Sequence, residues 1–170
     1  MRLSVNKLIF LDFDGVLNRC EPEGWMITRT ASGLEHGLVD NVAKLVFLTG
    51  AKVVVSSTWR EMYSLKRLQK LLEDHGLHKR HVVDVTPDLP FTTRGFEIAA
   101  FLAKKRVAQP TQFVVLDDND FGRFDMDPVR AHLVRTEAQN GFTEKDIDRA
   151  QALLTTGPIW DYALQLSAAG

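Results

Sequence analysis

The sequence predicts an α/β fold, in which a doubly wound, mostly parallel, Rossmann-like sheet has helices on both faces. Two observations carry this prediction. Short apolar runs alternate along the chain with longer segments in which apolar residues recur at helical spacing. The chain also has 170 residues, 45% of them hydrophobic and 25% charged, which suits a single globular domain over residues 1–170.

Five apolar runs are the expected strands, at residues 8–11, 53–55, 81–85, 113–116 and 132–134. They are short and apolar on both faces, which is typical of parallel strands covered by helices. Four helices are expected at residues 38–48, 61–75, 96–102 and 143–157. The last of these has Glu144 and Asp146 in its first turn, where negative charge complements the helix dipole.

Overall charge and cysteine content restrict the class of protein. The formal net charge is -1, which does not indicate bulk attraction to a membrane and mildly disfavours long nucleic acid, although a nucleic-acid partner stays open. The lone cysteine, Cys20, excludes an internal disulfide and fits a reducing compartment. The N-terminal apolar run is too short for a membrane span. We therefore expect a cytoplasmic protein without a membrane partner; its oligomeric state is unknown.

Polar side chains gather where three of the expected strands end: Asp12 and Asp14 after the first, Ser56, Ser57 and Thr58 after the second, and Asp117, Asp118 and Asp120 after the fourth. In open α/β sheets, ligands bind outside the carboxyl ends of the strands. Carboxylates that converge there repel one another unless a cation lies between them. Oxygen ligands alone favour a hard ion, and Mg²⁺ suits a site that also takes a substrate phosphate.

These residues resemble the motifs of the haloacid dehalogenase (HAD) superfamily of phosphohydrolases, and in particular its small capless, phosphatase-type members. The likeness consists of the segment DFDGVLN at residues 12–18, a second strand that ends in hydroxyl residues, a basic residue further on, and the pair Asp117 and Asp118. The four motifs occur in the family's order between residues 7 and 120.

The resemblance implies a role for each acidic residue. Asp12 would be the nucleophile that forms an aspartyl-phosphate, and Asp14 would be the general acid and then the general base. Mg²⁺ would be held by Asp12, by Asp14 through its backbone carbonyl, and by Asp118. Asp117 would support the ion indirectly or bind it through water, and which member of this pair is the direct ligand stays open.

The phosphate-binding residues are less sharply defined. Gly15 would let the backbone turn where a side chain would obstruct the phosphate. One hydroxyl is expected on the phosphate, preferably that of Ser57, with Ser56 as the alternative. Most of the family has a lysine in the third motif, whereas the matching position in this chain is Arg94. Lys104 and Lys105 belong to the far end of the same expected helix.

Two further features concern access to the site. Trp59 either packs its helix on the sheet or lines the substrate entrance, where Arg60 would meet an anionic group. The connection at residues 19–37 has room only for a short flap. Many members of the family insert a cap domain, so the resemblance implies that this chain lacks a large cap domain and has an open site. Such a site admits bulky substrates or relies on a partner subunit to close it.

The resemblance thus implies a Mg²⁺-dependent phosphomonoesterase acting on an unidentified phosphorylated substrate, such as a nucleotide, a nucleic-acid end or a phosphoprotein. The alternative is a catalytically idle phosphate-binding or regulatory module of the same fold.

Overall fold

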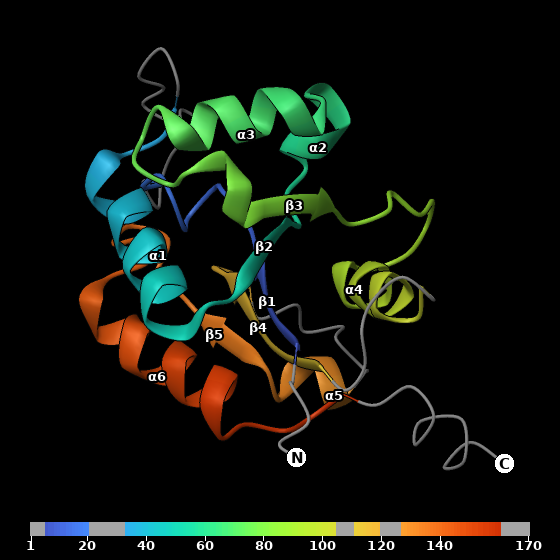
Figure 1. Cartoon of the computed structure of the whole chain (residues 1–170). Helices are drawn as coiled ribbons and strands as arrows, with labels where there is room; N and C mark the ends of the chain where they lie inside the picture. The colour runs from blue at the N-terminus through green and yellow to red at the C-terminus, as the bar shows by residue number, and fades with distance from the viewer. Residues whose placement is uncertain (1–5, 21–32, 105–110, 120–126, 161–170) are drawn as a thin grey trace, which may run out of the picture.

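The core of the chain is a five-stranded parallel sheet, seen edge-on among its helices in Figure 1. The computed structural model describes residues 6–20, 33–104, 111–119 and 127–160. The strands are β1 (Asn6–Leu11), β2 (Lys52–Val55), β3 (Val82–Val85), β4 (Thr111–Asp117) and β5 (Leu133–Arg135), in the spatial order β3-β2-β1-β4-β5. All four pairings are parallel, so the predicted doubly wound α/β fold is confirmed.

Helices cover both faces of the sheet. They are α1 (His36–Thr49), α2 (Trp59–Met62), α3 (Leu65–Glu73), α4 (Arg94–Leu102), α5 (Asp127–Arg130) and α6 (Glu144–Thr155), with a 3₁₀ turn, η1, at Lys79–His81. Buried residues of α1, α3 and α6 form one apolar cluster with alternate strand residues such as Ile9 and Leu11. The other strand residues, among them Phe10 and Phe113, pack with α4 and α5 on the opposite face (Figure 1).

The helix expected at residues 61–75 differs from the prediction, and α5 and η1 were not predicted. Residues 61–75 were expected to form a single helix, but the chain forms α2 and then α3, with an extended backbone at Tyr63 (φ -129°, ψ 136°). Ser64 caps α3, because its hydroxyl accepts a hydrogen bond from the backbone N–H of Arg67. Met62 and Tyr63, at the break, are both exposed, so core packing does not require a continuous helix there.

The strand order fixes where a ligand can bind. The chain runs from β1 through β2 to β3 in one direction and then crosses to β4 and β5 on the other side of β1. The connections therefore diverge between β1 and β4, and in open sheets of this kind ligands bind outside the carboxyl ends of two such strands. Of the flap expected within residues 19–37, the segment 21–32 lies outside the described residues. In the described part of the chain, no helix combines the length and apolar character that crossing a membrane requires.

Candidate active site

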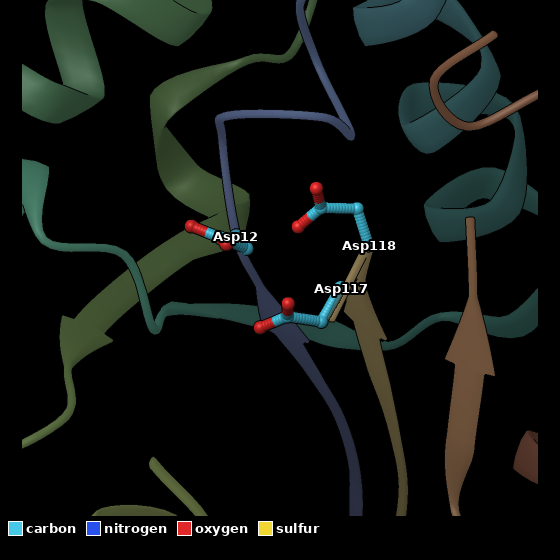
Figure 2. Close-up of side chains that lie close together, drawn as sticks. All are labelled: Asp12, Asp117 and Asp118. Atoms are coloured by element: carbon cyan, nitrogen blue, oxygen red, sulfur yellow. The ribbon is translucent and has the colours of Figure 1, made fainter. Parts of the chain in front are cut away.

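The register of the sheet brings three carboxylates together at the ends of β1 and β4. Leu11 pairs with Leu116, so Asp12 and Asp117 follow side by side and, by strand alternation, belong to the face covered by α4. Figure 2 shows Asp12, Asp117 and Asp118 gathered around the ends of these two strands. One carboxylate oxygen from each lies within 4.8 Å of the others. No other such group occurs among the residues the structure describes.

Arg94, the first residue of α4, neutralises part of this charge. Its Nη1 lies 2.7 Å from Oδ2 of Asp12 and 2.6 Å from Oδ2 of Asp117. Burial alone would lower the pKa of Arg94, but the charges of Asp12 and Asp117 outweigh it and raise that pKa, so the guanidinium stays charged. Lys104 lies past the other end of the helix, with Nζ 4.9 Å from the ring centre of Phe101. Lys105 is outside the described residues.

The remaining negative charge makes the cluster fit a hard divalent cation. Burial, and then the charge of Asp12, raises the pKa of Asp117 and of Asp118, although Arg94 offsets part of this. A cation among these oxygens would relieve the repulsion. Both oxygens of Asp117 already accept hydrogen bonds, from Arg94 and from the backbone N–H of Asn119. Asp118 is more exposed, so its carboxylate is the better placed of the pair to bind an ion directly.

Asp14 stands apart from this cluster. Its Oδ2 accepts a hydrogen bond from the indole Nε1 of Trp59 at 2.9 Å, and its Oδ1 accepts one from Nδ2 of Asn18 at 2.8 Å. The two aspartates of the first motif are therefore held differently, Asp12 by a guanidinium and Asp14 by neutral donors. Sequence reasoning considered Trp59 only as packing or as an entrance residue and gave Asn18 no role. The only available signal was that both side chains can donate.

Gly15 brings the first motif against the fourth. Its φ is +72°, and a Cβ added there would lie 2.5 Å from Cγ of Asp118. The group that a side chain would displace is thus the carboxylate of Asp118. The carbonyl oxygen of Gly15 also accepts a hydrogen bond from the hydroxyl of Thr136 at 2.8 Å. This turn therefore lies against the residue that follows β4 and is hydrogen-bonded to the chain after β5.

Both candidate serines are buried at the end of β2. Ser56 is 1% exposed, and its Oγ has no hydrogen-bond partner among the described residues. Its backbone N–H donates to the carbonyl of Leu11, which continues the ladder and, by alternation, puts Ser56 on the same face as Asp12. Ser57 is fully buried, and its Oγ accepts a hydrogen bond from the backbone N–H of Trp59 at 3.4 Å. Both hydroxyls are therefore candidates for binding a phosphate.

Arg60 makes contacts within the protein. Its Nη2 lies 2.7 Å from Oε2 of Glu97, and the two side chains are only 5% and 8% exposed. Its Nη1 donates to the carbonyl of Ser57, and Oε1 of Glu97 accepts the backbone N–H of Leu89. This buried pair joins the end of β2 to α4. Sequence reasoning did not single out Glu97, because nothing in its spacing shows that its side chain meets that of Arg60.

A parallel sheet with β1 at its centre, paired aspartates at the end of β1 and a further acidic pair at the end of β4 define a HAD-type hydrolase domain. The family described as the HAD domain in Swiss Army Knife RNA repair proteins matches residues 8–147, and the chain belongs to this family. The resemblance read from the motifs is therefore confirmed. No curated protein and no solved structure matches the chain. Membership supports a hydrolase of the phosphatase type in general terms.

Proposed function

We propose that this chain is a Mg²⁺-dependent phosphomonoesterase that works through an aspartyl-phosphate on Asp12. The observation that carries the proposal is that the two carboxyl groups of the first motif have different partners. Asp12 lies beside the guanidinium of Arg94, whose positive charge faces the proposed nucleophile. Among the described residues, the side chain of Asp14 accepts hydrogen bonds from two neutral groups, those of Trp59 and Asn18. It lies outside the acidic cluster. Such a carboxyl group can act as an acid and a base.

The donor set fits Mg²⁺, which takes carboxylate and carbonyl oxygens. Asp12, Asp118 and the backbone carbonyl of Asp14 would hold the ion, with Asp117 supporting it indirectly or binding it through water. When bound, the ion would neutralise charge on the phosphate and on the carboxylates around it.

Two steps follow from the roles of the residues. In the first, an oxygen of Asp12 forms a bond to phosphorus while the bond from phosphorus to the leaving oxygen breaks. Asp14 gives its proton to that oxygen, and an alcohol leaves. In the second, Asp14 takes a proton from a water molecule whose oxygen attacks phosphorus, and the bond to Asp12 breaks to release phosphate. Arg94 and the hydroxyl of Ser57 or Ser56 would bind the phosphate oxygens, and the unpartnered Oγ of Ser56 keeps that residue a candidate.

For the substrate, we propose a phosphorylated RNA end. The description of the family names RNA repair proteins, which favours a nucleic-acid end over a free nucleotide or a phosphoprotein. A net charge of -1 suits recognition of an end, since a long duplex needs a basic surface. We also propose that residues 1–170 form one domain and that the protein acts in the cytoplasm, as its single cysteine suggests.

The test is phosphate release. With Mg²⁺, the protein should release phosphate from 4-nitrophenyl phosphate and from an oligoribonucleotide with a terminal phosphate, and EDTA should stop the reaction. Asp12→Asn should abolish both activities, whereas Asp148→Asn, a change on the exposed face of α6, should alter neither. Full activity of Asp12→Asn would overturn the proposal. Mg²⁺-dependent binding of a phosphate analogue, without turnover on a broad panel of phosphoesters, would instead indicate the idle module.

A further inference from the structure

The carboxyl group of Asp14 is held at both of its oxygens. The indole N–H of Trp59 donates to Oδ2 at 2.9 Å, and the amide of Asn18 donates to Oδ1 at 2.8 Å. Trp59 begins α2, after β2, whereas Asn18 belongs to the turn after β1. Two neighbouring strands thus each supply one donor to the same group.

The donor on Trp59 is itself fixed in direction. Trp59 is 7% exposed, and its ring centre lies 5.2 Å from that of Phe13 and 5.9 Å from that of Tyr63. Gly33 borders the outer edge of the indole, where a Cβ would come within 2.9 Å of the ring. The indole is therefore confined on several sides. Its N–H can only donate, and it is aimed at Asp14.

The amide of Asn18 is equally constrained. Asn18 is 3% exposed, and its Oδ1 accepts the backbone N–H of Gly15 at 3.0 Å. Because the amide oxygen is engaged there, the NH₂ group is the end that faces Asp14. Both donors are neutral, so they set the direction of the carboxyl group without adding charge to it. A carboxylate has about four lone-pair sites, which leaves positions for a proton and a substrate.

We propose that Trp59, together with Asn18, is a positioning residue that aims the carboxyl group of Asp14 at the leaving oxygen. The inference rests on the proposed function, in which Asp14 donates the proton. It predicts a dependence on the leaving group, because proton donation matters most when the departing oxygen is strongly basic. A residue that only packs the helix on the sheet would affect all substrates alike.

The experiment compares Trp59→Phe with the wild type on phenyl phosphate and on 4-nitrophenyl phosphate. The two substrates are similar in shape, but phenol is much more basic than nitrophenol as a leaving group. Phenylalanine keeps a ring against Phe13 and removes the N–H. The matched control is Trp160→Phe, since Trp160 is 5% exposed, belongs to the apolar cluster on the α4 side, and has an Nε1 without a partner among the described residues.

In Trp59→Phe, kcat/KM for phenyl phosphate should fall by about 100-fold, which is the scale of general acid catalysis. The kcat/KM for 4-nitrophenyl phosphate should fall by only about tenfold. Trp160→Phe should leave both values unchanged. Equal losses on the two substrates would overturn the positioning role while leaving the proposed function intact. A wild type that hydrolyses neither substrate with Mg²⁺ would overturn the proposed function and, with it, this inference.

A second variant applies if Trp59→Phe does not unfold cooperatively. Asn18→Ala removes the other donor and leaves the indole in place. It should show the same unequal loss, larger on phenyl phosphate than on 4-nitrophenyl phosphate. Equal losses in a cooperatively folded Asn18→Ala protein would count against the inference.

Discussion

Arg94 balances two buried carboxylates through one nitrogen, Nη1, which lies within 2.7 Å of Asp12 and 2.6 Å of Asp117. Arg94→Met would leave both carboxylates without this charge. We expect kcat/KM to fall by at least about 100-fold, as when a charge-stabilising donor is removed from an active site. Arg94→Lys retains a positive charge but not the planar guanidinium, so its activity should lie between those of the wild type and Arg94→Met. Steady-state kinetics on 4-nitrophenyl phosphate measure this, and wild-type activity of Arg94→Met would contradict it.

Gly15 combines a left-handed backbone conformation with close contact to the side chain of Asp118. Gly15→Ala should destabilise the fold by about 1–3 kcal/mol, because φ is +72° there. It should also weaken Mg²⁺ binding, since the new Cβ would meet the carboxylate of Asp118 at 2.5 Å. Urea unfolding and calorimetric titration with Mg²⁺ measure the two effects.

Gly50 provides the control for this change. It has φ +70°, but open space lies where its Cβ would go. Gly50→Ala should therefore reproduce the loss of stability and leave Mg²⁺ affinity unchanged. If both variants bind Mg²⁺ equally well, the proximity of Gly15 to Asp118 does not matter for the ion.

At the scale of elements, the buried pair of Arg60 and Glu97 ties the end of β2 to α4, which carries Arg94. Glu97→Gln leaves a buried guanidinium without its counter-charge. We expect a loss of about 3–5 kcal/mol in the free energy of unfolding, the usual result of breaking a buried ion pair from one side. The activity should also fall, because α4 loses an attachment close to Arg94.

An exposed ion pair serves for comparison. Lys44 and Glu144 lie 3.1 Å apart, with side chains 54% and 76% exposed. Glu144→Gln should change the free energy of unfolding by at most about 1 kcal/mol. Urea denaturation of both variants is the measurement, and equal losses would show that burial of the Arg60–Glu97 pair is not what makes it strong.

The sequence predicted those helices and strands whose apolar residues recur at a clear helical or strand spacing. All five strands and the helices α1, α4 and α6 form where the apolar runs indicate them. The break between α2 and α3 was not predicted. The run of leucines indicates one continuous helix, and a single serine gives little sign in the sequence that its hydroxyl caps a new helix at Ser64.

The candidate site was predictable to the extent that strand ends converge. The meeting of Asp12, Asp117 and Asp118 follows from parallel topology, as does the presence of Arg94 at the near end of α4. The contacts of Trp59 with Asp14 and of Arg60 with Glu97 could not be predicted, because they join side chains that are far apart in sequence. The spacing of residues along one helix or strand shows which of them share a face, but not which side chains of other elements they contact.

At the scale of the whole molecule, stability is linked to pH through the acidic cluster. Burial, and then the charge of Asp12, raises the pKa of Asp117 to about 8. A carboxyl group whose pKa is raised by folding stabilises the fold below its ordinary pKa, and this contribution is lost as pH rises through the raised value. The metal-free protein should therefore lose stability between about pH 4 and pH 8 from this source. Mg²⁺ should stabilise the protein more at pH 8 than at pH 6, because it favours the ionised carboxylates.

Thermal melts with EDTA and with Mg²⁺ across this range measure the effect. The matched variant is Asp117→Asn, which removes the titrating group. Its melting temperature in EDTA should vary less with pH than that of the wild type over the upper half of the range. Identical pH profiles for the two proteins would show that Asp117 does not contribute.

The hydrogen bond between Trp59 and Asp14 also gives the chain an optical reporter of its own chemistry. Indole emission responds to hydrogen bonding and to nearby charge, and this indole donates directly to the proposed proton donor. The chain has three tryptophans, and Trp160 packs in the cluster on the opposite face of the sheet from Trp59. A fluorescence change on mixing with Mg²⁺ and a phosphoester should persist in Trp160→Phe and vanish in Trp59→Phe. Stopped-flow emission could then follow Asp14 during a single turnover, without a label attached to the protein or to the substrate.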